Sequence, residues 1–241
     1  MAGVLDQFME LEEGELSKYV ADIEVQGVIA QVCTVTLNRG QTLWVSRGSL
    51  LAYSEGIEWT LKVPGGVGKA LGRMMTGEGA ALVFVTCTAD GATVLLAANM
   101  PGKLATWDLA RGSITCTSGS FVAAMGDVDI SVTMARSAGA MFFGGAGLFL
   151  QQLSGSGVAL INGSGDFIER KLGAGEKLLV STGNLAVFSS DVGYGVRGVG
   201  GCRKMAFGGE GLFMTELVGP GWVMLQSLKK LPPQRGKPGP Q

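Results

Sequence analysis

The side chains that could do acid–base or nucleophilic chemistry here are carboxylates, lysines and cysteines, because the 241 residues include no histidine. The lack of histidine excludes Ser-His-Asp and Cys-His catalysis, the usual zinc sites and histidine-based metal centres. Two pairs of acids lie close along the chain, Asp127 with Asp129 and Glu55 with Glu58. Such a pair could serve as general acid and base or bind Ca²⁺ or Mg²⁺. We favour the simpler interpretation that these carboxylates face solvent at strand ends and turns.

The cysteines are expected to be reduced thiols. The four are Cys33, Cys87, Cys116 and Cys202, and none forms a C-x-x-C pair. The acidic N-terminal stretch has no hydrophobic signal segment, so we expect a cytoplasmic protein. The first three lie in β-like runs, which predicts burial as small apolar residues. Cys202 lies between Gly201 and Arg203, which leaves a more reactive thiol open as an alternative.

The composition is that of a folded, glycine-rich protein. Hydrophobic residues make up 46% of the chain and charged residues 16%, and 40 residues are glycine. A disordered chain has the opposite balance of apolar and charged residues. The net charge of −1 offers no positive excess for phosphates, so we expect no nucleic-acid partner. The uncharged stretch 137–165 is broken by glycines and glutamines; we expect strands there and no transmembrane segment, and leave peripheral membrane association open.

Two short glycine patterns alternate along the chain. The first is an S/T-x-G strand end, centred on Gly48, Gly119 and Gly183. The second is a G-x-G turn, at Gly77-Glu78-Gly79, Gly145-Ala146-Gly147 and Gly209-Glu210-Gly211. Copies of each pattern lie about 65–70 residues apart, a spacing typical of tandem structural units. An apolar strand and a further glycine follow each G-x-G turn, which predicts a hairpin around Gly91, Gly157 and Gly221.

These patterns predict an all-β fold of three tandem modules, each a β-sandwich or double-stranded β-helix, in a pseudo-threefold arrangement. If each unit is a G-x-G half followed by an S/T-x-G half, the third unit joins residues 209–228 to residues 25–59. The N- and C-terminal segments then close the third module, which removes exposed sheet edges. This closure requires the C-terminal strands to hydrogen-bond with the N-terminal ones.

The predicted domain organisation has three parts. Residues 1–18 form an acidic segment, amphipathic from Val4 to Leu16. Residues 19–231 form the β domain, with one weak helical candidate at 67–75. Residues 232–241 are rich in proline, glycine and lysine and are expected to be disordered.

Several of these residues carry a resemblance to a known family. Residues 208–213 (GGEGLF), Gly219-Pro220-Gly221 and residues 180–188 (VSTGNLAVF) resemble the signature of the AIM24 family, formerly domain of unknown function 124. The resemblance covers roughly residues 20–230. Ser181 stands where the family pattern has aspartate, and Asn184 where it has histidine. A metal or acid–base role for that pair is therefore not carried over.

The resemblance implies a fold of three related modules, similar to the tryptophan RNA-binding attenuation protein, that self-assembles. A fungal mitochondrial member of the family is linked to inner-membrane organisation. We therefore expect a non-enzymatic homo-oligomer, acting as a scaffold or in membrane organisation, with no catalytic, cofactor or metal site. The residues singled out are then structural: Gly48, Gly119, Gly183, Gly77, Gly145, Gly209, Glu210, Gly211, Gly219, Pro220 and Gly221. The alternative is a protein that binds a small molecule or oligonucleotide in clefts between modules.

Overall fold

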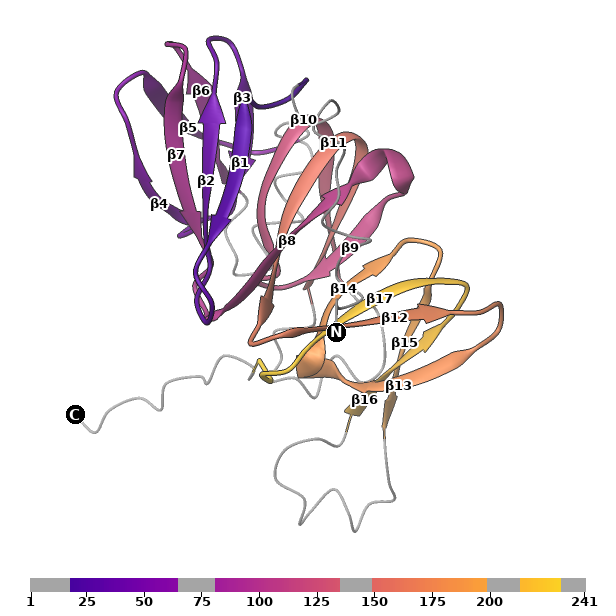
Figure 1. Ribbon diagram of the computed structural model, residues 1–241. Coiled ribbons are helices and arrows are strands. Elements are labelled where there is room, and N and C mark those ends of the chain that lie inside the picture. The colour runs from indigo at the N-terminus through magenta and orange to yellow at the C-terminus, as the bar shows by residue number, and fades with distance from the viewer. Residues whose placement is uncertain (1–17, 65–80, 135–148, 199–212, 231–241) are drawn as a thin grey trace, which may run out of the picture.

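The described part of the protein is all-β, as the sequence predicts. The computed structural model describes residues 18–64, 81–134, 149–198 and 213–230 (Figure 1). Within these ranges the helical pieces are two 3-10 turns, Leu109–Arg111 and Thr182–Asn184. The predicted amphipathic segment at 4–16, the helical candidate at 67–75 and the tail at 232–241 lie outside the described residues.

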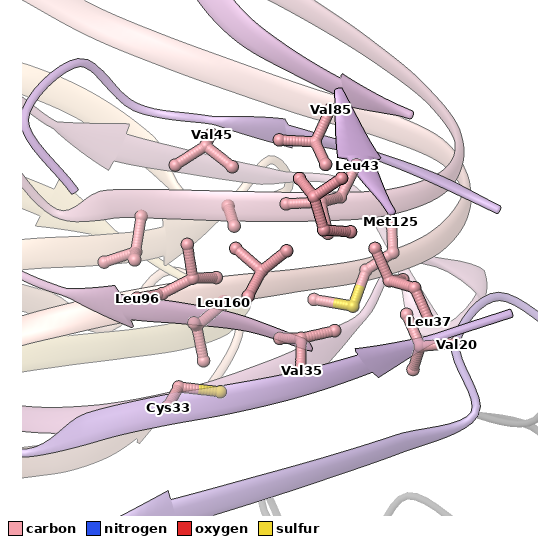
Figure 2. Close-up of a cluster of buried hydrophobic side chains, with 14 of the residues drawn as sticks. Val20, Cys33, Val35, Leu37, Leu43, Val45, Val85, Leu96, Met125 and Leu160 are labelled. Atoms are coloured by element: carbon pink, nitrogen blue, oxygen red, sulfur yellow. The ribbon is translucent and has the colours of Figure 1, made fainter. Parts of the chain in front are cut away.

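The first group of strands, which we call module 1, lies between residues 22 and 97. Its strands are β1 (Asp22–Gln26), β2 (Val32–Leu37), β3 (Thr42–Val45), β4 (Leu50–Tyr53), β5 (Ile57–Lys62), β6 (Leu82–Cys87) and β7 (Ala92–Ala97). One sheet has the order β1-β2-β7-β4, and a second row runs β3-β6-β5. Alternate residues of β2 and β7 are buried, as expected for strands with one covered face. Cys33, Val35, Leu43 and Val85 meet in the core between the two rows (Figure 2).

The remaining strands form two further groups, which we call modules 2 and 3. Module 2 contains β8 (Gly102–Asp108), β9 (Ile114–Thr117), β10 (Phe121–Met134) and β11 (Phe149–Ser164). Module 3 contains β12 (Phe167–Leu172), β13 (Lys177–Ser181), β14 (Leu185–Ser189), β15 (Gly193–Gly198), β16 (Phe213–Val218) and β17 (Gly221–Gln226). In module 3 the rows are β12-β17-β14 and β13-β16-β15. The long strands β10 and β11 of module 2 pair over almost their whole length, so each serves both rows.

The strand pairing repeats in detail. β4 pairs with β7, β10 with β11, and β14 with β17, and each pair has a register shift of one residue. The shifts lie at Leu50/Ala52, Phe121/Ala123 and Leu185/Val187. Each lies two residues after a glycine of the S/T-x-G pattern. We therefore call residues at the same place in this pairing scheme counterparts.

Neighbouring modules are joined by shared sheets. β3 of module 1 pairs with β10 of module 2, with Val45 opposite Ala123. β9 of module 2 pairs with β14 of module 3, with Cys116 opposite Val187. In both junctions the strand before an S/T-x-G loop pairs with the strand after the S/T-x-G loop of the next module. One sheet therefore runs from β12 through to β5.

The predicted closure of the third module by the two chain ends is wrong. In the described residues β16 pairs with β13 and β15, and β17 pairs with β12 and β14. The N-terminal strands instead complete module 1 together with β6 and β7. The alternating glycine patterns can be divided in either order, and the chain uses S/T-x-G first and G-x-G second. That order lets each module form from strands near one another in sequence, as most connections do.

The predicted hairpins are wrong as well. Gly91 lies between β6 and β7, and Gly221 begins β17 after β16. However, β6 is not hydrogen-bonded to β7, and β16 is not hydrogen-bonded to β17. The strands on either side belong to the two opposed rows of their module. Gly157 lies inside β11, which continues without interruption. Gly91 and Gly221 therefore mark places where the chain crosses from one row to the other, which the spacing alone cannot distinguish from a hairpin.

Candidate functional site at the open sheet edges

The S/T-x-G loops join consecutive strands. Gly48 lies between β3 and β4 with φ of 83°, and Gly119 between β9 and β10 with φ of 72°. Both values lie in the left-handed region that favours glycine. Gly183 lies in the 3-10 turn between β13 and β14, where its carbonyl accepts hydrogen bonds from Gln226 Nε2 (2.7 Å) and the Lys230 amide (2.9 Å). These glycines serve the backbone geometry of the loops.

Lys230 connects two of these loops. Its Nζ donates to Ser120 Oγ at 2.9 Å and to the Ser118 carbonyl at 3.3 Å. At the first loop, the amide of Asn99 lies where a Cβ on Gly48 would be placed. Asn99 after β7 and Lys230 after β17 therefore pack against S/T-x-G loops. These contacts are structural and bring together no pair of catalytic groups among the described residues.

The Gly219-Pro220-Gly221 motif forms the turn between β16 and β17. The Gly219–Pro220 peptide bond is cis, and Gly221 has φ of 141°. A Cβ on Gly219 would collide with the carbonyl oxygen of Gly173, so the turn depends on close backbone approach. The remaining motif residues, Gly77, Gly145, Gly209, Glu210 and Gly211, lie outside the described residues.

The described thiols are shielded from solvent. Cys33, Cys87 and Cys116 are free and buried, as predicted. Burial raises the pKa of Cys33 and of Cys116 to about 12. A thiol with so high a pKa has little thiolate and is a poor nucleophile near neutral pH. Cys202 lies outside the described residues.

The predicted acid pairs are solvent-facing. Asp127 and Asp129 are exposed on β10, Glu55 is exposed before β5, and Glu58 is exposed on it. This matches the simpler interpretation of these carboxylates. Within the described ranges, no group of three or more acidic or cysteine side chains is placed to hold a metal ion.

Glu169 on β12 was not singled out by its sequence context. Both of its carboxylate oxygens are inaccessible to solvent and have no hydrogen-bond partner in the described part of the chain. Burial raises its pKa to about 7, because the charged form loses hydration. Desolvation is the cause of this shift, with no charged residue of the described ranges contributing to it, so Glu169 gives no indication of a coupled catalytic pair.

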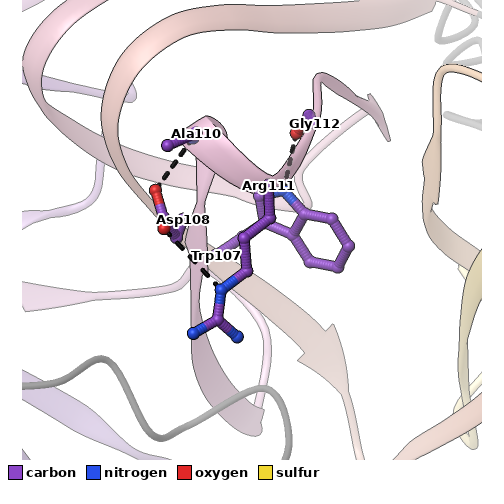
Figure 3. A network of polar contacts seen from close by, with 5 residues as sticks. All are labelled: Trp107, Asp108, Ala110, Arg111 and Gly112. Carbon is purple, nitrogen blue, oxygen red and sulfur yellow. Dashed lines mark hydrogen bonds and ion pairs between the residues drawn. The ribbon is translucent and has the colours of Figure 1, made fainter.

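A further polar network lies between β8 and β9 (Figure 3). Asp108 accepts a hydrogen bond from the Ala110 amide at 2.8 Å and lies 3.7 Å from Arg111 Nε. Trp107 Nε1 donates to the Gly112 carbonyl at 2.8 Å. The hydrogen bond from the Ala110 amide to Asp108 caps the short 3-10 turn, which gives this network a structural role.

Several strands at sheet edges have one partner in the described chain, and two of them, β4 and β13, have an open side whose equivalent is paired in both other modules. Among the described residues, β4 pairs only with β7, and β13 pairs only with β16. Their counterparts have partners on both sides: β10 and β14 correspond to β4, and β3 and β9 correspond to β13. An unpaired edge presents free backbone N–H and C=O groups to another strand.

The side chains of β4 are exposed where those of its counterparts are buried. Leu51 is 59% exposed, whereas its counterparts Val122 and Ala186 are 1% and 0% exposed. Tyr53 shows the same contrast, with 49% against 4% for Phe188. Leu179 on β13 is likewise 50% exposed. The two open edges therefore carry apolar surface of the kind that the junctions between modules cover.

The sequence of β4 already indicates that this strand is suited to being covered on both faces. Residues 50–53 read Leu-Leu-Ala-Tyr, without the alternation expected of a strand with one wet face. The counterparts at 121–124 and 185–188 are also continuously apolar, as in strands covered on both faces. The alignment of Gly48 with Gly119 and Gly183 was enough to make this comparison.

Comparison with known proteins agrees with this fold. The family model for mitochondrial biogenesis AIM24 matches residues 23–228. The chain belongs to the AIM24 family. The residues that suggested this resemblance, around Gly183 and at Gly219-Pro220-Gly221, lie within the matched range.

Among curated proteins, this AIM24 family member is 27% identical over 128 residues to an uncharacterised protein, M6_Spy0233, of Streptococcus pyogenes serotype M6. The match covers 50% of this chain and 51% of that protein, about half the length of each. The crystal structure of protein SPYM3_0169 from Streptococcus pyogenes is similar with a TM-score of 0.71 and 21% identity. That similarity covers 86% of this chain and 94% of the other, and it concerns the fold. In the described residues, no helix has the length and apolar character needed to cross a membrane.

Proposed function

We propose that this AIM24 family protein is a non-enzymatic scaffold that associates with further copies of itself through its open sheet edges. The observation that carries the proposal is the exposure of Leu51 and Tyr53 on β4, whose counterparts are buried. Burying side chains of this size contributes roughly 1–2 kcal/mol each. An apolar, unpaired edge that remains exposed would otherwise favour aggregation.

The chemistry of the described residues supports the non-enzymatic part of the proposal. The acids singled out by their spacing are exposed and the described thiols are buried. The pKa of Glu169 is raised by desolvation alone, with no coupled ionisable partner among the described residues. An enzyme would be expected to combine such a group with a second one in a common cleft.

The pseudo-threefold relation of the three modules is part of the same proposal. It is supported by the equivalent strand pairs and by the register shift that recurs after Gly48, Gly119 and Gly183. In a chain of equivalent modules, the open edge of the first module (β4) matches the edge that would pair with the open edge of the last module (β13).

The test is the mass of the purified full chain in solution. Because self-association depends on concentration, the protein is measured at roughly 1–50 µM. We expect sedimentation velocity and light scattering to give species larger than the 24.9 kDa chain. A strict monomer over the whole range would contradict the proposal. A thermal-shift screen with nucleotides, amino acids and divalent ions addresses the alternative, a ligand-binding protein, for which a reproducible rise in Tm would be required.

A further inference from the structure

We propose that β13 of one copy pairs antiparallel with β4 of the next, in the register that places Val180 opposite Ala52. This inference rests on the proposed self-association and specifies its partner and geometry. The contact is head-to-tail, because it joins two different edges of the same protein.

The register follows from the two junctions inside the chain. Val45 lies opposite Ala123 in the first, and Cys116 lies opposite Val187 in the second. β13 and β16 pair so that Val180 occupies the place of Val45 and Cys116. The shared register shift places Ala52 where Ala123 and Val187 lie. Pairing β13 with β4 therefore reproduces a junction that the protein already forms twice.

The side chains fit this third junction. Val45, Ala123, Cys116 and Val187 are small and at most 1% exposed. Val180 and Ala52 are of the same size and apolar character. One position along, Tyr53 would lie opposite Leu179, so one exposed apolar side chain from each edge would cover the other.

Backbone hydrogen bonds define the same geometry. In the first junction the Ser46 amide donates to the Val122 carbonyl at 2.8 Å, and in the second the Ser190 amide donates to the Ser113 carbonyl at 2.9 Å. The corresponding bonds between copies would join Ser181 to the Leu51 carbonyl and Glu55 to the Lys177 carbonyl. Because hydrogen-bonded and non-bonded pairs alternate, Ala52 and Val180 form a non-hydrogen-bonded pair.

Charge agrees with this register. Lys177 lies opposite Glu55 in the proposed pairing, and both side chains are exposed in the single chain. Lys177 already lies 3.5 Å from Glu216 on the neighbouring strand. Opposite charges on facing strands favour a register, whereas like charges disfavour it.

The partner must be a second copy. Figure 1 places β4 in module 1 and β13 in module 3 at opposite ends of the described part of the protein. β4 and β13 share no pairing in the described chain. Repeated head-to-tail contacts produce a closed ring if the rotation per copy closes and an open filament if it does not.

The experiment is disulfide trapping between two single variants, Ala52→Cys and Val180→Cys, each in a Cys202→Ser background. In a non-hydrogen-bonded pair the Cα atoms lie about 4.5 Å apart, within the range that a disulfide spans. Cys116 already occupies the position of Val180 in the second junction, so the substitution suits this environment. We expect mild oxidation of the mixture to yield a covalent dimer that dithiothreitol reverses.

The matched control replaces Val180→Cys with Leu179→Cys, whose side chain points to the other face of β13. We expect at least tenfold less dimer from this mixture. Greater cross-linking of Ala52→Cys with itself would indicate β4-to-β4 contacts and overturn the proposal.

A second measurement keeps the two proposals separate. If the wild-type chain is a monomer, the proposed function fails. If it assembles, yet Ala52→Cys and Val180→Cys do not cross-link and Leu179→Lys leaves the assembly unchanged, only the β4–β13 pairing fails. A chain with both cysteines is expected to give a ladder of covalent multimers, which ends at the copy number if the assembly is a ring.

Discussion

Glu169 shows how one residue can make this fold sensitive to pH. Its carboxylate oxygens are buried and accept no hydrogen bond from the described residues, and burial raises its pKa from 4.5 to about 7. Between these values the folded protein binds more protons than the unfolded chain. The free energy of unfolding therefore falls as pH rises from 4.5 to 7 and stays lower above pH 7.

We expect Glu169→Gln to remove this dependence. The variant should be more stable than wild type by about 1 kcal/mol at pH 8, since solvent screening at this half-buried residue limits the effect. At pH 4, where the acid is neutral in both states, the two proteins should match. Urea denaturation at both pH values measures this, with Glu58→Gln on exposed β5 as the control. Equal stability of wild type and Glu169→Gln at pH 8 would contradict the expectation.

Gly157 lies where the packing leaves no room for a side chain. A Cβ there would collide with the Met125 carbonyl oxygen and lie 2.8 Å from Val128 Cγ2. We expect Gly157→Ala to lower the free energy of unfolding by roughly 1–3 kcal/mol, as overpacking does. At Gly173 the nearest atom to a Cβ is Glu176 Oε2, 3.6 Å away, so Gly173→Ala is the matched control. Chemical denaturation showing the same loss for both would contradict this account.

Among the secondary-structure elements, β4 differs from β10 and β14 in its neighbours. The same register shift and a continuously apolar start occur in all three, but β10 and β14 lie inside a continuous sheet. β4 lies at the end of its sheet. Its exposed residues are therefore a consequence of its position in the molecule.

We expect Tyr53→Lys to weaken self-association at least 100-fold without unfolding the chain. Tyr53 is 49% exposed in the single chain, so a lysine there stays hydrated. In the β4–β13 contact, the lysine would have to bury its charge, which costs several kcal/mol. The control is Ile29→Lys, which alters a side chain that is 79% exposed away from both edges. Sedimentation velocity that shows equal weakening for both variants would contradict the role of the edge.

At the scale of the whole molecule, head-to-tail contacts between β4 and β13 imply that a chain with one blocked edge stops the assembly from growing further. A Tyr53→Lys chain retains β13 and can still bind the β4 edge of a wild-type chain. We expect the mean mass of a wild-type sample to fall steadily as this variant is added at constant total concentration. Light scattering measures the effect, and a Tyr53→Lys/Leu179→Lys chain, blocked at both ends, is the control. A mean mass lowered no further by the single variant than by the double variant would contradict head-to-tail growth.

The all-β class and the repeat could be predicted from local features. Alternating apolar residues in β2, and the left-handed backbone required at Gly48 and Gly119, are properties of short stretches of chain. The lack of histidine settled what chemistry to exclude. Burial of the described cysteines followed from their β-like surroundings. These features do not depend on which distant strands become neighbours.

The order of the half-units and the open edges were decided by tertiary structure. Alternating S/T-x-G and G-x-G patterns can be divided in two ways, and the long-range strand pairing, such as that of β6 with β3 and β5, distinguishes them. The same applies to Leu51 and Tyr53, which resemble their buried counterparts in sequence. Whether such a strand is buried depends on the presence of a neighbouring module. That is a non-local property, so it cannot be predicted from the residues of the strand itself.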